Sequence, residues 1–88
     1  MVERGEDGRS WFAGDSKGGA PTRCELSEDG LTVTHGRNDW AESFDISELD
    51  RRLAFYRRML ETYRHPSYAQ DAAVLAAALE ATQTRAAA

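Results

Sequence analysis

Residues 30–63 read GLTVTHGRNDWAESFDISELDRRLAFYRRMLETY, and this stretch decides the fold. Its first part alternates β-branched and polar residues, which is typical of a strand, and Gly36-Arg37-Asn38-Asp39 then marks a turn before a second strand at about residues 40–44. The remainder repeats apolar residues at spacings of three and four, as one face of a helix does. The stretch therefore predicts two strands followed by an amphipathic helix.

A third strand is predicted just before this stretch. Residues 22–26 precede Ser27-Glu28-Asp29-Gly30, and the Asp-Gly pair is a strong turn signal. We therefore expect a small antiparallel β-meander over about residues 22–44, with its three strands in sequence order.

Two amphipathic helices complete the predicted α+β fold. The first should cover about residues 47–64, with Asp45 and Glu48, or Ser47 and Asp50, as its capping pair. Pro66 ends it, and a second capping sequence follows directly, so the second helix should cover about residues 67–84. Two helices joined by so short a link form a V or an antiparallel hairpin.

The N-terminal residues 1–21 combine glycines and charges without sustained periodicity, and they are predicted to form a flexible arm. Trp11 and Phe12 stand out in it, because two adjacent large aromatic side chains are costly to leave in water. Either they fold back on the core, or they anchor the arm on another subunit. The prediction is one small domain over residues 1–88, with its folded core at 22–84.

Length and composition limit the possibilities. A chain of 88 residues has room for one thin core. Its only cysteine, Cys24, cannot form an internal disulfide, and no apolar stretch approaches the roughly 20 residues that span a bilayer. The first residues do not resemble a secretory signal. We expect a cytoplasmic protein, or a virion component if the chain comes from a phage, with no membrane partner.

Charge is unevenly distributed along the chain. Residues 1–50 hold 5 basic and 12 acidic side chains, whereas residues 51–88 hold 6 basic and 3 acidic ones. The arginines of the first helix could contact phosphates, but the overall charge of −4 argues against strong nucleic-acid binding. Arg51 and Arg58 are instead expected on a solvated face, or in ion pairs with the acidic half of a neighbouring copy.

No catalytic, metal or cofactor site is predicted. Ser16 lies in a Gly-rich sequence that only superficially resembles a serine protease motif, and so short a chain cannot build that site. Cys24 and His35 could be combined with an acid as a nucleophile, base and orienter, but a buried thiol and a strand-end histidine are the favoured interpretation. His65 suits a helix end, where a cation is stabilised by the dipole. A small-molecule substrate is not expected.

Phe55 and Met59 form the predicted partner surface on the first helix. They lie one turn apart and off its main apolar stripe, so they mark a second apolar strip that is open to a partner or packs against the sheet. The residues expected to bind a partner are Trp11, Phe12, Arg51, Phe55, Arg58 and Met59.

Residues 30–63 resemble the small head-to-tail joining proteins of tailed phages, in which a β-hairpin runs through a short Ser-containing cap into an amphipathic helix. Those proteins have a helix before the hairpin, where this chain has its Gly-rich segment. The resemblance implies a non-enzymatic adaptor that works in a ring of copies between portal and tail. The alternative is a small regulatory or inhibitory protein that docks its acidic sheet, or the Phe55 and Met59 strip, on a larger protein.

Overall fold

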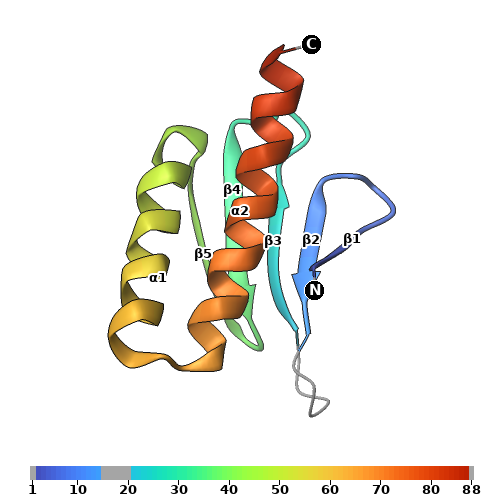
Figure 1. Ribbon diagram of the computed structural model, residues 1–88. Helices are drawn as coiled ribbons and strands as arrows, with labels where there is room; N and C mark the ends of the chain where they lie inside the picture. Colours follow the sequence, from blue (N-terminus) through green and yellow to red (C-terminus); the bar gives the residue numbers. More distant parts are fainter. Residues whose placement is uncertain (1, 15–20, 88) are drawn as a thin grey trace.

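Five antiparallel strands form one sheet in the order β1-β2-β3-β4-β5, so that the strand order follows the sequence (Figure 1). The computed structural model describes residues 2–14 and 21–87. The strands are β1 (Val2–Arg4), β2 (Ser10–Ala13), β3 (Thr22–Leu26), β4 (Thr32–Arg37) and β5 (Trp40–Asp45). The predicted α+β class is confirmed, and the predicted meander corresponds to β3, β4 and β5.

The flexible-arm prediction was wrong for the residues that form β1 and β2. Trp11 and Ala13 alternate onto the covered face of the sheet and are buried, so this segment is held by the core. Gly8, with φ of 71°, lies in the turn between the two strands, because glycine adopts this left-handed conformation without a steric penalty. Gly8, one of the glycines on which the flexible-arm prediction rested, therefore forms part of a turn. The rest of the predicted arm, residues 15–20, lies outside the described residues.

Local side chains fix where the helices begin and end. A short 3-10 helix, η1 (Ile46–Glu48), starts at Asp45, whose carboxylate accepts a hydrogen bond from the Ser47 backbone N–H at 2.9 Å. It continues into α1 (Leu49–Tyr63), and α2 covers Pro66–Ala87. Both helices are therefore confirmed, with the second extending about three residues beyond its predicted end.

The link between the helices is tight. Arg64 adopts a left-handed conformation, with φ of 55°, and its N–H bonds the Leu60 carbonyl. His65 then accepts the backbone N–H of Ser67 on Nδ1 at 3.1 Å. His65 therefore caps the start of α2, in addition to its predicted place at the end of the first helix.

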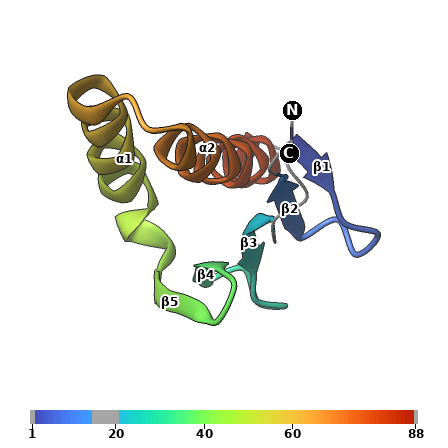
Figure 2. The ribbon, with the colours of Figure 1, turned by 90° about the horizontal axis from the view of Figure 1, so that it is seen from below.

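The helices cover one face of the sheet. In Figure 2, α2 lies across the sheet and α1 lies beside α2 in the same layer. The core between sheet and helices includes Val33 and Phe44 from the strands, Leu49 and Leu53 from α1, and Leu75 from α2. Over the described residues, no helix has the length and apolar character needed to cross a bilayer.

Candidate protein-binding groove

A groove of about 520 Å³ lies between the start of α1 and β5. Glu42 from β5 lines it, and the other lining residues come from η1 and α1: Glu48, Arg51, Arg52, Phe55, Tyr56 and Arg58. In Figure 1 α1 lies to the side of β5 away from β4, and Figure 2 shows it beside α2 on the covered side of the sheet. We call this feature the α1–β5 groove.

The apolar periodicity of α1 explains which side chains reach the groove. Leu49 and Leu53 are buried and orient the helix on the core. Phe55 follows two residues after Leu53, is turned off the buried face, and remains 45% exposed. Arg51 and Arg58 lie one turn before and one turn after it and are also exposed. An exposed aromatic ring is thus flanked by two cations.

Arg52 and Glu42 join α1 to β5 inside the groove. Nη1 of Arg52 lies 2.8 Å from Oε1 of Glu42, which is an ion-pair distance although the two groups are not aligned as a hydrogen bond. The Arg52 guanidinium also lies 4.6 Å from the centre of the Phe44 ring, where a cation is attracted by the ring electrons. Arg52 is therefore held in place, whereas no ion pair to Arg51 or Arg58 is found among the described residues.

A buried polar network lies behind Glu42. His35, on β4, is fully buried, and its Nε2 donates to the Asp71 carboxylate of α2 at 2.8 Å. Arg37 donates to the same carboxylate at 3.1 Å and to the Thr22 hydroxyl at 2.6 Å. Among the described residues Nδ1 of His35 finds no hydrogen-bond partner, and it lies 3.8 Å from Glu42. The network therefore connects the sheet to α2 and ends at the groove.

Tyr56 separates His35 from the groove. Its ring meets the His35 ring edge-on at 5.2 Å, and the Phe55 ring also meets it edge-on at the same centroid distance. Burial, assisted by the carboxylates of Glu42 and Asp71, raises the pKa of Tyr56 to about 12. The phenol is therefore neutral at physiological pH, and the Tyr56 side chain forms part of the groove wall.

Cys24 and His35 face each other across β3 and β4, as a nucleophile and base would need to. The thiol, however, is fully buried, and burial raises its pKa to about 12. It is therefore protonated at neutral pH, which suits the packing role that was predicted for it. His35 differs from the prediction, since it lies within β4 and is not at a strand end. In residues 2–14 and 21–87 there is no group of three metal-ligating side chains.

Three of the six residues predicted to bind a partner meet in the α1–β5 groove, namely Arg51, Phe55 and Arg58. Met59 is half-buried and does not line it. Trp11 is only 5% exposed, so its predicted role as an exposed anchor was wrong, and the alternative that it folds back on the core holds. Phe12 is half-buried and pairs with Glu3 and Arg23 on the uncovered face of the sheet. Ser16 lies outside the described residues.

Sequence reasoning missed the contributions of Glu42, Arg52 and Tyr56 to the groove. In the sequence, Tyr56 belongs to the apolar stripe of the helix and Glu42 lies between two aromatic positions of a strand, so neither stands out. Their approach depends on how α1 leaves β5, which local spacing does not determine. The charge pattern, with Glu42 ten residues before Arg52, gave no signal of the pair.

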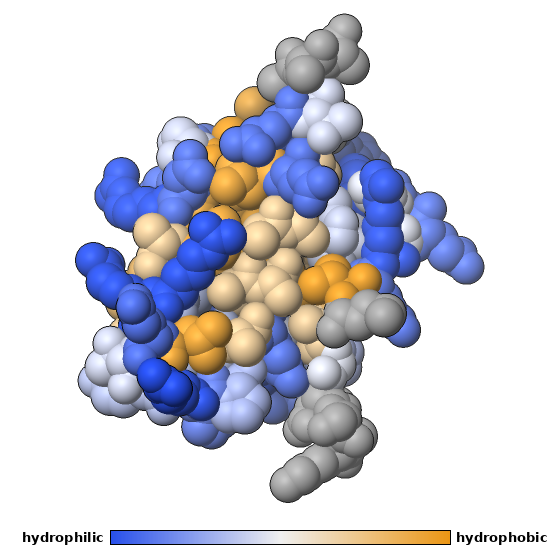
Figure 3. Space-filling model, viewed as in Figure 1, coloured by the Kyte–Doolittle hydropathy of each residue, from blue (hydrophilic) through white to orange (hydrophobic). Residues whose placement is uncertain are grey.

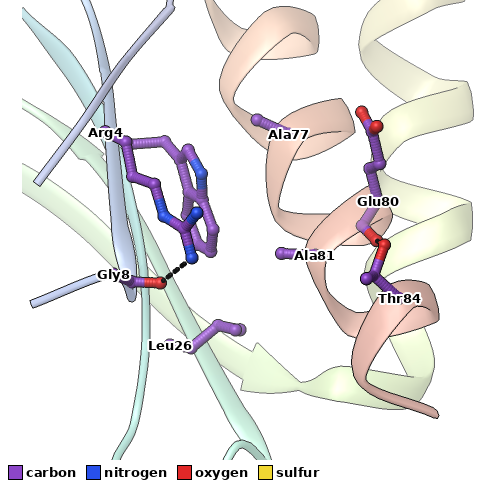
Figure 4. Close-up of a pocket in the computed structure, with 8 residues that line it drawn as sticks. Arg4, Gly8, Leu26, Ala77, Glu80, Ala81 and Thr84 are labelled. Atoms are coloured by element: carbon purple, nitrogen blue, oxygen red, sulfur yellow. Dashed lines mark hydrogen bonds between the residues drawn. The ribbon is translucent and has the colours of Figure 1, made fainter. Parts of the chain in front are cut away.

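A second groove, of about 310 Å³, lies between the first hairpin and the end of α2. Arg4, Trp11 and Leu26 line it from the sheet, and Ala77 and Ala81 line it from α2 (Figure 4). The Arg4 guanidinium is tethered by a 3.1 Å hydrogen bond to the Gly8 carbonyl. The lining of this groove includes three small residues, Gly8, Ala77 and Ala81. The view onto the helices in Figure 3 likewise shows apolar side chains over α2, with strongly hydrophilic ones gathered over α1.

Comparisons of the chain with models of protein families, with curated proteins and with solved structures found no match.

Proposed function

We propose that this chain is a non-enzymatic adaptor that acts through protein–protein contacts at the α1–β5 groove. The resemblance of residues 30–63 to head-to-tail joining proteins implies the setting, a phage or phage-like particle. In that setting the protein acts in the cytoplasm during assembly or as part of the virion.

The observation that carries the proposal is the exposed Phe55 between Arg51 and Arg58. Aromatic and arginine side chains are enriched where proteins bind one another, because a ring buries much area and a guanidinium makes several hydrogen bonds. Phe55 is 45% exposed on a helix whose other aromatic wall residue, Tyr56, is half-buried. A partner that covers Phe55 gains apolar burial and meets two available cations.

Charge indicates the kind of partner. The groove contains three arginines and two glutamates, and Arg52 is already paired with Glu42. The cations that remain on the rim favour an acidic surface, and the exposed Phe55 beside them favours a protein over a phosphate backbone, because aromatic side chains are enriched where proteins bind one another. The partner is therefore an acidic protein or an acidic part of another copy.

A small regulatory or inhibitory protein is the second candidate. One observation supports this candidate: among the described residues, the exposed aromatic ring and the unpaired cations lie in one groove. A single groove fits a single partner bound one to one. An adaptor is expected to hold more than one neighbour. Light scattering on the purified complex measures this stoichiometry and separates the two candidates.

Co-purification with matched variants tests the proposal. The tagged chain is expressed in the cells that carry its gene, as wild type, as the Arg51→Glu and Arg58→Glu double variant, and as Arg57→Glu. Arg57 is exposed on α1 but does not line the groove, so its variant controls for charge alone. We expect wild type and control to retain the same stoichiometric protein and the double variant to lose it. Equal retention by all three forms would show that the groove is not the docking surface.

A further inference from the structure

The free edge of β5 carries unpaired backbone groups. β5 is the last strand of the sheet, and the Ile46 N–H bonds the Leu31 carbonyl at 2.9 Å, which sets the phase of the β4–β5 ladder. Hydrogen-bonded pairs alternate with non-bonded pairs in an antiparallel ladder, so the register assigns the bonds toward β4 to Trp40, Glu42 and Phe44. The N–H and C=O groups of Ala41 and Ser43 therefore point away from the sheet.

β5 has little edge protection of its own. Sheet edges are commonly protected by lysine, proline, a bulge or an inward-pointing charge; β5 contains none of the first three, and its inward-pointing charge, Glu42, is paired with Arg52. The side chains at the two unpaired positions, Ala41 and Ser43, are small and exposed on the uncovered face. The edge is a template on which a further strand can form hydrogen bonds.

Helix α1 lies on the covered side of the same edge. It lies to the side of β5 in Figure 1 and beside α2 in Figure 2, and the α1–β5 groove is an open hollow that runs along α1 from Glu42 of β5. A strand added to β5 would direct every second side chain into that space, because side chains alternate between the faces of a sheet. Those side chains would approach Phe55 and the three arginines of the groove, which outnumber its two glutamates, Glu42 and Glu48.

We propose that the α1–β5 groove takes an extended, acidic segment of a partner protein as an added strand on β5. This inference rests on the proposed function and specifies how the partner docks. Backbone bonds to Ala41 and Ser43 supply affinity, whereas side-chain pockets supply selectivity. In the bound segment, the side chain that faces Phe55 is apolar. The side chains two positions before and after it are carboxylates, which bind the arginines of the groove.

A designed peptide tests strand addition on the full chain. The probe is acetyl-Thr-Glu-Thr-Val-Thr-Glu-Thr-amide, whose alternate residues present carboxylate, apolar and carboxylate groups on one face. The reference peptide has Lys in place of Glu. We expect the Glu peptide to bind at least 10-fold more tightly and to slow amide hydrogen exchange at Ala41 and Ser43, measured by nuclear magnetic resonance. Equal binding of the two peptides, or unchanged exchange at both amides, would overturn the inference.

N-methylated peptides separate strand pairing from charge attraction. The Glu peptide is made with N-methyl groups on alternate residues, in each of the two possible sets, since only one set of amides faces β5. We expect one set to weaken binding at least 10-fold and the other to leave it nearly unchanged. If both sets bind as tightly as the parent, strand addition is wrong, but the docking role of the groove is unaffected.

Variants of the chain locate the binding. The Arg51→Glu and Arg58→Glu double variant should weaken binding of the Glu peptide at least 10-fold, and Arg57→Glu should not. All three side chains are exposed, so folding is preserved, and circular dichroism verifies it. A double variant that binds as tightly as wild type would place the peptide elsewhere. Co-purification of the natural partner remains an independent test of the adaptor proposal.

Discussion

At the residue scale, Asp71 organises the buried polar network. It is 5% exposed and accepts hydrogen bonds from His35 on β4 and from Arg37 at the end of the same strand. Burying a carboxylate is costly unless cations and donors compensate, and both are present here. The network therefore fixes the position of α2 over the sheet and, through His35 and Tyr56, the rear wall of the groove.

Replacing Asp71 with alanine should destabilise the protein strongly. The change leaves His35 without its carboxylate partner in a fully buried position, and breaking such a buried pair costs about 3 kcal/mol or more. The free energy of unfolding from urea titration measures this, with Asp50→Ala on the exposed face of α1 as the control. A loss below about 1 kcal/mol for the Asp71 variant would contradict the importance given to the network.

Alkaline pH should destabilise the protein through two side chains, Cys24 and Tyr56, whose pKa values are raised by burial. Burial raises the pKa of Cys24 from 9.0 to about 12, and that of Tyr56 from 10.0 to about 12. Between these limits the unfolded chain loses protons that the folded chain keeps, so stability is full below about pH 9 and falls as pH rises toward 12. Urea midpoints measured from pH 8 to 11.5 should fall, and Tyr56→Phe should reduce the slope. Equal slopes for the two forms would contradict the assignment to Tyr56.

At the element scale, the first hairpin is part of the fold. Trp11 lies opposite Cys24 in the β2–β3 register and is almost fully buried. Replacing Trp11 with alanine should therefore cost about 3 kcal/mol or more, as for other buried aromatic residues. Phe12→Ala, on the uncovered face, should cost much less and provides the comparison. If both changes lowered the urea midpoint by the same small amount, the prediction of a flexible arm would be right and the first hairpin would not be part of the stable fold.

The elements that sequence reasoning predicted correctly are those with strong local signals. Asp29-Gly30 marks the β3–β4 turn, and the spacing of Leu49, Leu53 and Tyr56 identifies the face of α1. β2 is only four residues long and lies among glycines and charges, so its alternation is too brief to stand out. Its place in the sheet depends on pairing with β3, a contact that local patterns do not specify.

The same distinction applies to the groove. Arg51, Phe55 and Arg58 belong to one helix face, so their common location followed from the sequence. Glu42 joins them only because α1 folds back beside β5, and Asp71 reaches His35 from 36 residues away. Such contacts depend on how the helices pack on the sheet, and no sequence motif predicts them.

At the scale of the whole molecule, the fold leaves one edge of its sheet open beneath a helix. The acidic residues are concentrated in the N-terminal half and the cations of α1 border the groove, so the molecule is electrically polar. This polarity orients an acidic partner toward α1 before contact. The edge of β5, the exposed Phe55 and the rim arginines then act together on one bound segment.

Site-specific photo-crosslinking tests this account most directly. A photoreactive phenylalanine analogue replaces Phe55 in one form of the chain and Arg57 in a second, and both are irradiated in the cells that carry the gene. The account predicts one discrete protein adduct from position 55 and none from position 57. It also predicts that the adduct from position 55 disappears when Arg51 and Arg58 are changed to Glu. No adduct from position 55, or the same adducts from both positions, would contradict it.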